Sequence, residues 1–174
     1  MKIILWIYVK LIRPWTSFLF YYLWDAFVPE TEGEVPLAAS IQNYSNFLKS
    51  FKYKSDPIFG LIDFSPRKLT DIFRPKKTGN DCDDRSWYWF EWAKVNCDEV
   101  YEVIYTSWKI WNSHAICIFR IKNQWHIASN YLFIKKGWRS FDDIITYLKA
   151  THKEKLYFQI VRKAGKTQWS HLHL

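Results

Sequence analysis

The aromatic segment WYWFEW, at residues 87–92, constrains the fold of this chain more than any other part of its sequence. Asn80 or Asp81 can cap a helix that begins just before it, and the acidic side chains at 81–84 suit the positive end of a helix dipole. Within such a helix the rings point in every direction, and a helix that is apolar all round has to be buried. We therefore predict a central helix that is covered by the rest of the domain.

Strand-like alternation of apolar residues replaces the helical pattern after Cys97. It predicts a meander of three β-strands, with a tight turn at Lys122–Asn123 between the second and the third. A helix with a capping box formed by Ser140 and Asp143 follows, and then a last strand. Because helices and strands are segregated along the chain, we predict an α+β fold with an antiparallel sheet. The strands are predicted at residues 99–111, 114–123, 124–134 and 156–161, and two further helical segments at 37–51 and near 68–73.

The length of 174 residues fits one domain with an N-terminal extension, since a typical domain has about 100 to 150 residues. The segment VPETEGEVP carries acidic residues, two prolines and a glycine, which are typical of a linker. We therefore divide the chain into an aromatic N-terminal arm at 1–30, a linker at 31–36, a folded domain at 37–166 and a C-terminal tail at 167–174.

The N-terminal arm starts with features of a signal peptide, Lys2 followed by an apolar run at 3–9. Lys10 and Arg13 interrupt the run, and no small-residue cleavage site follows. The arm also lacks a run of about 18 apolar residues, which disfavours a membrane-spanning helix. Two aromatic helical segments that lie on a membrane surface or on a protein assembly fit the sequence better. Packing of the arm on its own domain is the alternative.

The net charge of +8, from 25 basic and 17 acidic residues, is unevenly distributed. Residues 81–102 hold seven acidic and two basic side chains, whereas basic side chains dominate residues 109–166. A basic surface attracts nucleic acid, anionic lipid or an acidic partner, although it can also serve solubility alone. Nucleic-acid binding is disfavoured because the aromatic rings that could stack on bases lie in the buried helix, away from the basic residues.

The three cysteines, Cys82, Cys97 and Cys117, occur without a CxxC spacing. An odd number without paired spacing argues against a disulfide framework and a structural zinc site, and it favours a reducing compartment. We therefore expect a cytoplasmic or membrane-associated protein, with Cys97 and Cys117 in structural roles.

The aspartates at 81–84 have the chemistry to bind Ca²⁺ or Mg²⁺, but they do not encircle an ion and they lack EF-hand spacing. We expect no metal and no cofactor.

Cys82 lies where a helix N-terminus favours the reactive thiolate form. The carboxylates on either side act in the opposite direction, so an efficient nucleophile here needs a base within hydrogen-bonding distance. The base in turn needs a third group that holds its ring in the right tautomer. His114 opens the second strand and Asn130 closes the third, and adjacent antiparallel strands can bring these two side chains together. We expect His126 on the surface of its strand and assign His152 no role.

Three segments carry a resemblance to a known family: GNDCDDRS at 79–86, HAICIFRI at 114–121 and QWHIASN at 124–130. They are similar to motifs of the bacterial transglutaminase-like cysteine peptidases, a family within the wider papain-like and transglutaminase fold. The resemblance spans about residues 37–162 and leaves the N-terminal arm outside. It implies a papain-like or transglutaminase-like architecture and a Cys-His-Asp triad that acts on amide bonds.

By this resemblance, Cys82 is the nucleophile and His114 the base. The family's aspartate falls on Ser129 if Trp125 anchors the alignment. Successive strand residues face opposite sides of a sheet, so the offset of one residue to Asn130 matters. Papain-like enzymes use asparagine in this role, and a bulge can present Asn130 to the histidine. We therefore predict a triad of Cys82, His114 and Asn130, with Asn80, Asp81, Asp84 and Ser129 as oxyanion-binding or supporting residues.

The predicted function is that of a thiol-dependent amide hydrolase or acyltransferase whose substrate is a protein or peptide. The alternative is a catalytically weak or inactive protein on the same scaffold that docks on a membrane or an assembly through residues 1–30. Ser129 in place of an aspartate, and the arm outside the domain, favour this alternative. A phage origin, and with it a location in the virion, would suit such a compact stand-alone chain. A basic adaptor for nucleic acid is a third hypothesis.

Overall fold

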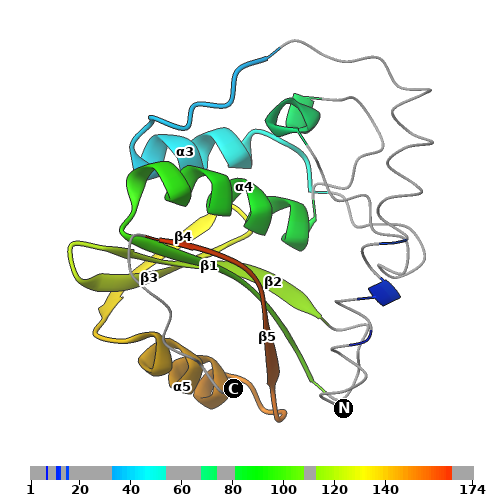
Figure 1. Cartoon of the computed structure of the whole chain (residues 1–174), viewed down its shortest axis with the longest axis vertical. Coiled ribbons are helices and arrows are strands. Elements are labelled where there is room, and N and C mark those ends of the chain that lie inside the picture. The colour runs from blue at the N-terminus through cyan, green and yellow to red at the C-terminus, as the bar shows by residue number, and fades with distance from the viewer. Residues whose placement is uncertain are drawn as a thin grey trace.

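The structure, a computed structural model, describes residues 33–53, 68–73, 81–107 and 113–165, together with Ile7, Leu11, Ile12 and Trp15. Within the four continuous ranges the chain forms three α-helices, one short 3-10 helix and a five-stranded antiparallel sheet (Figure 1). The predicted α+β class is therefore confirmed. The elements are α3 (Ile41–Lys49), η3 (Leu69–Phe73), α4 (Cys82–Asn96), β1 (Glu99–Thr106), β2 (His114–Ile121), β3 (Gln124–Ser129), β4 (Leu132–Trp138), α5 (Phe141–Thr151) and β5 (Tyr157–Gly165).

The strands are arranged in the order β4-β3-β2-β1-β5, and each neighbouring pair is antiparallel. β2 and β3 form a hairpin whose turn residues, Lys122 and Asn123, have positive φ angles of 49° and 61°, which confirms the predicted turn. Two residues with positive φ are typical of tight turns whose twist matches that of the strands. β5 pairs with β1 and runs to Gly165, beyond the predicted end of this strand at residue 161.

The run predicted as one strand at 124–134 is two strands in the structure. β3 ends at Ser129, a turn of Asn130 and Tyr131 follows, and β4 begins at Leu132. Asn130 has a φ of 54°, in the left-handed region that asparagine adopts more readily than most other side chains. The prediction of a single strand is wrong because the strand-like pattern continues across this turn, so the sequence contains no visible break.

The sheet is covered by α3 and α4 on one face and by α5 on the other (Figure 1). On the α4 face, the rings of Tyr44, Trp89, Trp92 and Phe119 pack together with centroid separations of 5.1 to 6.3 Å. Trp89 is fully buried, as predicted for the aromatic helix. Large rings in close contact bury much apolar area and hold their elements in place. This packing fixes α4, and with it Cys82 at its first turn, against β1 and β2.

The second face of the sheet is closed by α5. This helix begins at the predicted capping box, in which Ser140 Oγ accepts a hydrogen bond from the Asp143 backbone N–H at 3.1 Å. Asp143 Oδ2 accepts one from the Ser140 backbone N–H at 3.0 Å. The ring of Phe141 then packs on Tyr101 of β1, with centroids 5.0 Å apart. The other end of α5 reaches the end of β1, where the ring of His152 lies 5.3 Å from that of Tyr105.

Glu102 is a fully buried acid that links three elements. Its carboxylate accepts hydrogen bonds from Arg162 of β5 at 2.7 Å and from Ser86 of α4 at 3.3 Å. A buried carboxylate that had no cation beside it would strongly destabilise the fold. These contacts therefore tie α4 to β1 and β5 in addition to the aromatic packing.

His126 is buried, with 5% of its surface exposed, so the expectation that it lies on the strand surface is wrong. Its ring lies 5.9 Å from that of Phe119 and 5.3 Å from that of Phe133. β3 is an inner strand of a sheet that is covered on both faces, so both sets of alternating side chains are buried. A polar residue in an alternating pattern points to solvent only where one face of the sheet is open.

The N-terminal arm lies largely outside the described residues, as do the C-terminal tail at 167–174 and the boundary predicted at residue 30. The four described residues of the arm, Ile7, Leu11, Ile12 and Trp15, all have exposed side chains. Among the described residues, no helix combines the length and the hydropathy that crossing a bilayer requires.

Candidate active site

Cys82 is the first residue of α4, and a capping box fixes its position. The N-cap is Asp81, one of the two residues predicted for this role, and its carboxylate accepts a hydrogen bond from the Asp83 backbone N–H at 3.3 Å. Asp84 Oδ2 accepts one from the Asp81 backbone N–H at 3.4 Å. Asp84 has 1% of its surface exposed, so its carboxylate is buried at the base of the helix, as predicted. The thiol thus lies at a helix N-terminus, where the dipole favours the thiolate.

The side chain of Cys82 packs against Ile104 of β1 and Ala115 of β2. These two residues face each other across the strands, and the next pair along the ladder is Tyr105 and His114. The thiol therefore lies over the end of the β1–β2 ladder, one residue pair away from the predicted base. This proximity depends on long-range packing of α4 on the sheet, which the sequence motif alone does not provide.

Arg85 is a buried side chain one turn after Cys82 that holds residues 51–53 next to the site. Its Nη2 donates a hydrogen bond to the Phe51 carbonyl at 2.8 Å, and its guanidinium lies 5.4 Å from the ring centre of Tyr53. Burial raises the pKa of Tyr53 to about 12, and the negative charge of the Cys82 thiolate adds to the effect. Arg85 therefore holds Tyr53 close to the first turn of α4. Neither residue was predicted, although the spacing of three places Arg85 and Cys82 on one side of the helix.

His114, the first residue of β2, is held by two neighbours. Its Nε2 forms a hydrogen bond with Ser129 Oγ at 2.8 Å, and its ring lies 5.5 Å from that of Tyr105 at an angle of 75°. Burial lowers the pKa of the imidazole, and the nearby His152 lowers it further. A lowered pKa keeps the ring neutral at neutral pH, which is the form that accepts a proton.

The hydrogen bond with the imidazole, which we expected Asn130 to form, is formed by Ser129 Oγ instead. Asn130 lies in the turn after β3, where its backbone carbonyl accepts a hydrogen bond from Trp89 Nε1 at 2.8 Å. Its Oδ1 is buried and has no hydrogen-bond partner in the described part of the chain. The resemblance had placed the family's aspartate on position 129, and the contact is made from that position. A hydroxyl can orient the ring, but it carries no charge to stabilise an imidazolium as a carboxylate does.

Asn80, predicted as an oxyanion or supporting residue, lies outside the described residues. Asp81, Cys82 and Asp83 bring one possible metal-ligand atom each to within 4.8 Å of one another. The carboxylate of Asp81 is engaged in the helix cap, and adjacent acids at a helix start need no ion because the dipole stabilises them. The arrangement therefore fits helix capping.

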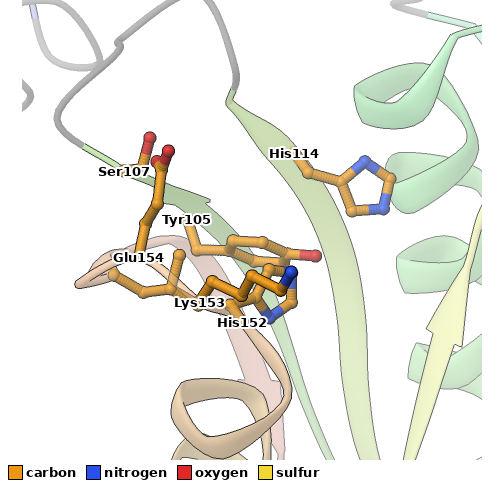
Figure 2. A pocket seen from close by; sticks show the side chains of 7 residues that line it. Tyr105, Ser107, His114, His152, Lys153 and Glu154 are labelled. Carbon is orange, nitrogen blue, oxygen red and sulfur yellow. The ribbon is translucent and has the colours of Figure 1, made fainter.

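A pocket of about 260 Å³ opens beside His114, between the end of the β1–β2 ladder and the connection from α5 to β5 (Figure 2). His152 is the residue after α5, and its Nδ1 is hydrogen-bonded to the Leu148 carbonyl at 2.8 Å. No local motif marks this pocket, because α5 meets the β1–β2 ladder only through the tertiary fold. The lining residues are Tyr105, Ser107, His114, His152, Lys153, Glu154 and Leu156.

The other two cysteines have environments that suppress the thiolate. Cys117 is fully buried, and burial followed by the charge of Glu102 raises its pKa. Burial followed by the charge of Asp98 raises the pKa of Cys97 to about 12. None of the three cysteines forms a disulfide. The reactivity of the Cys82 thiol can therefore be compared with that of Cys97 and Cys117 in the same protein.

Comparisons with protein-family models, with curated proteins and with solved structures found no match for this chain. The fold and the site together define a mixed α+β domain with a cysteine at the start of a buried helix and a histidine–serine pair at the adjoining end of the sheet. The function therefore has to be inferred from the chemistry of these side chains.

Proposed function

We propose that this protein is a thiol-dependent amide hydrolase or acyltransferase of the transglutaminase-like cysteine peptidase class, on a papain-like or transglutaminase-like scaffold. One observation carries the proposal: Cys82 at a helix N-terminus packs beside the strand pair next to His114, whose partly buried imidazole is hydrogen-bonded to Ser129. A thiol at a helix N-terminus and a neutral imidazole one residue pair along the adjoining ladder are the groups that covalent acyl transfer needs. The substrate class is a protein or peptide amide.

In the proposed reaction, Cys82 Sγ attacks the amide carbon and its proton passes to His114. Nδ1 takes this proton in the tautomer whose Nε2–H donates to Ser129 Oγ, because Nδ1 is then the unprotonated ring nitrogen. The carbonyl oxygen becomes an oxyanion, for which the backbone N–H of Cys82 is a donor at the helix N-terminus. The C–N bond then breaks, and the amine leaves with the proton from His114. Water or a second amine attacks the thioester, gives its proton to His114, and releases the thiol.

The first test is the reactivity of the thiols toward iodoacetamide in the native protein at pH 7, located by mass spectrometry of peptides. Cys82 should be alkylated first, because the environments of Cys97 and Cys117 raise their pKa values. Equal labelling of the three cysteines would contradict an activated Cys82.

The second test is cleavage of a mixed peptide library by the full chain, followed by mass spectrometry. Wild-type protein and the matched variant Cys97→Ala should generate the same products, whereas Cys82→Ala should generate none. Products that persist in Cys82→Ala would show that the cleavage does not use this thiol, and the proposal would be wrong.

A second candidate function is a catalytically weak protein that docks on a membrane, and three observations favour it. Cys82 packs against the pair of Ile104 and Ala115, and strand alternation turns His114, the residue before Ala115, to the other side of β2. The described residues of the arm, Ile7, Leu11, Ile12 and Trp15, are 38%, 50%, 46% and 74% exposed and have helical spacing. The first 24 residues contain three basic residues and no acidic one, which favours anionic lipid.

Vesicle binding by the full chain tests this candidate. The double variant Leu11→Glu and Trp15→Glu should lose co-sedimentation with phosphatidylserine-containing vesicles, because it places charge on exposed apolar positions. Val95→Glu on α4, where Val95 is 62% exposed, is the matched control and should bind like wild type. Absence of wild-type binding to these vesicles would rule out the lipid-docking function.

A further inference from the structure

Tyr105 is the residue of the pocket that touches the predicted base directly. It lies opposite His114 in the β1–β2 ladder, and the two rings are 5.5 Å apart at an angle of 75°. On its other side, the ring of His152 lies 5.3 Å away at 73°. Tyr105 is therefore placed between two imidazoles, at the junction of β1, β2 and the end of α5 (Figure 2).

We propose that Tyr105 is a positioning residue whose ring fixes the orientation of the His114 imidazole for proton transfer with Cys82. The inference rests on the proposed function and adds a residue to its site. Ser129 Oγ contacts one ring nitrogen at 2.8 Å and fixes only that point of the imidazole. A carboxylate at position 129 would hold the ring through its charge as well, and a neutral hydroxyl does not. The perpendicular ring of Tyr105 supplies the second contact that restricts rotation of the imidazole.

Tyr105 is itself held in place by the α5–β5 region. Its ring lies 5.9 Å from that of Phe158 on β5, in addition to the contact with His152. His152 is fixed in turn by the hydrogen bond of its Nδ1 with the Leu148 carbonyl of α5. His152 at the end of α5 thus packs on Tyr105, and Tyr105 packs on His114. A rigid support of this kind is what precise placement of a catalytic group requires.

Tyr105 follows Ile104 on β1. Cys82 packs against the pair of Ile104 and Ala115, and Tyr105 and His114 form the next pair of the same ladder. Burial raises the pKa of Tyr105, and the charge of the Cys82 thiolate adds to this. The phenol therefore stays protonated at neutral pH, and Tyr105 contributes a neutral ring rather than a charge.

The test compares Tyr105→Phe and Tyr105→Leu, with Tyr101→Leu as the matched control. Tyr101 lies on the same strand, packs on Phe141 and Trp125, and makes no ring contact with His114 among the described side chains. On a peptide from the cleavage test, Tyr105→Phe should keep kcat within about twofold because the ring remains. Tyr105→Leu should lower kcat about tenfold or more with KM little changed, since misplacement of a catalytic group costs rate. Tyr101→Leu should lower Tm and leave kcat per folded molecule unchanged.

Two kinetic results would overturn the inference: a wild-type kcat in Tyr105→Leu, or a loss in Tyr105→Phe as large as that in Tyr105→Leu. The second result would assign the effect to the hydroxyl and not to the ring.

A readout without substrate separates the inference from the proposed function. In ¹⁵N spectra of the full chain, His114 should show one tautomer in wild type and Tyr105→Phe, and a mixture in Tyr105→Leu because its ring can rotate. An unchanged single tautomer in Tyr105→Leu would overturn the positioning role whether or not the protein cleaves peptides. A mixture in a protein without peptidase activity would support the positioning role and contradict the proposed function.

Discussion

Ser129 Oγ holds Nε2 of His114 at 2.8 Å, at the position where the resemblance places an aspartate. A hydroxyl in this place orients the ring without favouring its charged form. Ser129→Asp should therefore raise the pKa of His114, because an adjacent carboxylate stabilises the imidazolium. The measurement is an NMR titration of His114 in a Cys82→Ala background, which removes the thiol from the titration. Asn130→Asp is the matched control, and an equal or larger shift there would contradict the assignment of the contact to Ser129.

His152 lowers the pKa of His114, after the larger effect of burial. Replacement of His152 by glutamine removes an imidazole that disfavours the charged form of His114. The pKa of His114 should therefore rise in His152→Gln. With His152 unchanged, the pKa of His114 in the Cys82→Ala protein should lie below the ordinary value of a histidine, because burial and His152 both lower it. Lys153→Gln in the same pocket is the control. A pKa of His114 that does not respond to His152→Gln would refute the coupling of the two imidazoles.

At the residue scale, the roles of Cys82 as nucleophile and His114 as base stay predictions, and the contact expected from Asn130 is made by Ser129. The position of Asn130 at the end of the predicted third strand and the use of asparagine in papain-like enzymes favoured Asn130, whereas the structure turns the chain at Asn130 and leaves Ser129 on the histidine. The φ angle of one residue decides this, and asparagine is compatible with both strand and turn. Tyr105 and His152 carried no local signal, since their contacts depend on where the end of α5 lies.

At the scale of elements, the segments with local signals were predicted well. Capping residues marked the starts of α4 and α5, and both capping boxes are present. The turn at Lys122–Asn123 was predicted from its position between two apolar runs. The break between β3 and β4 was missed, because apolar residues continue on both sides of it and Asn130 is the one turn-forming residue there. A single asparagine is compatible with a strand as well as with a turn, so it does not mark a break by itself.

The turn between β3 and β4 is anchored to α4 by Trp89, whose Nε1 donates a hydrogen bond to the Asn130 carbonyl at 2.8 Å. Trp89→Phe keeps an aromatic ring but removes this donor and part of the packing. It should lower the free energy of unfolding by about 1 to 3 kcal/mol, because a partly buried carbonyl loses its partner and the core loses part of its packing. Urea unfolding measures the change. Trp87→Phe, on the same helix at a partly buried position, is the control, and an equal effect in both variants would contradict the anchoring role of Trp89.

At the scale of the whole molecule, the sequence predicted the α+β class but not the order of the sheet. β5 pairs with β1, although three strands and a helix separate them in the chain, and this pairing also brings α5 to the end of the β1–β2 ladder. Periodicity identifies an element and its buried side, whereas its neighbours depend on the packing of the complete chain. The hairpin of β2 and β3, by contrast, is local, so the sequence could place His114 close to the end of β3, although it assigned the contact to Asn130 and Ser129 makes it.

The ion pair between Glu102 and Arg162 connects these distant parts of the chain. Glu102 is fully buried and Arg162 is 38% exposed, with 2.7 Å between their atoms. Arg162→Met should lower the free energy of unfolding by about 3 kcal/mol, the lower end of the range for breaking a buried ion pair, because Arg162 is partly solvated. Lys94→Met, which breaks the surface pair with Glu91, should cost about 0.5 kcal/mol or less. Similar losses in the two variants, measured by urea unfolding, would show that the buried pair does not support the fold.

The central claim, that the thiol of Cys82 and the imidazole of His114 act as a pair, is tested most directly by their mutual effect on titration. The measurement is the NMR titration of His114 in wild type and in Cys82→Ala, with Cys97→Ala as control. A thiolate beside the ring stabilises the imidazolium, so His114 should titrate at higher pH in wild type and Cys97→Ala than in Cys82→Ala. Superimposable titration curves of wild type and Cys82→Ala would contradict the account, because two groups that do not influence each other's protonation cannot exchange a proton in catalysis.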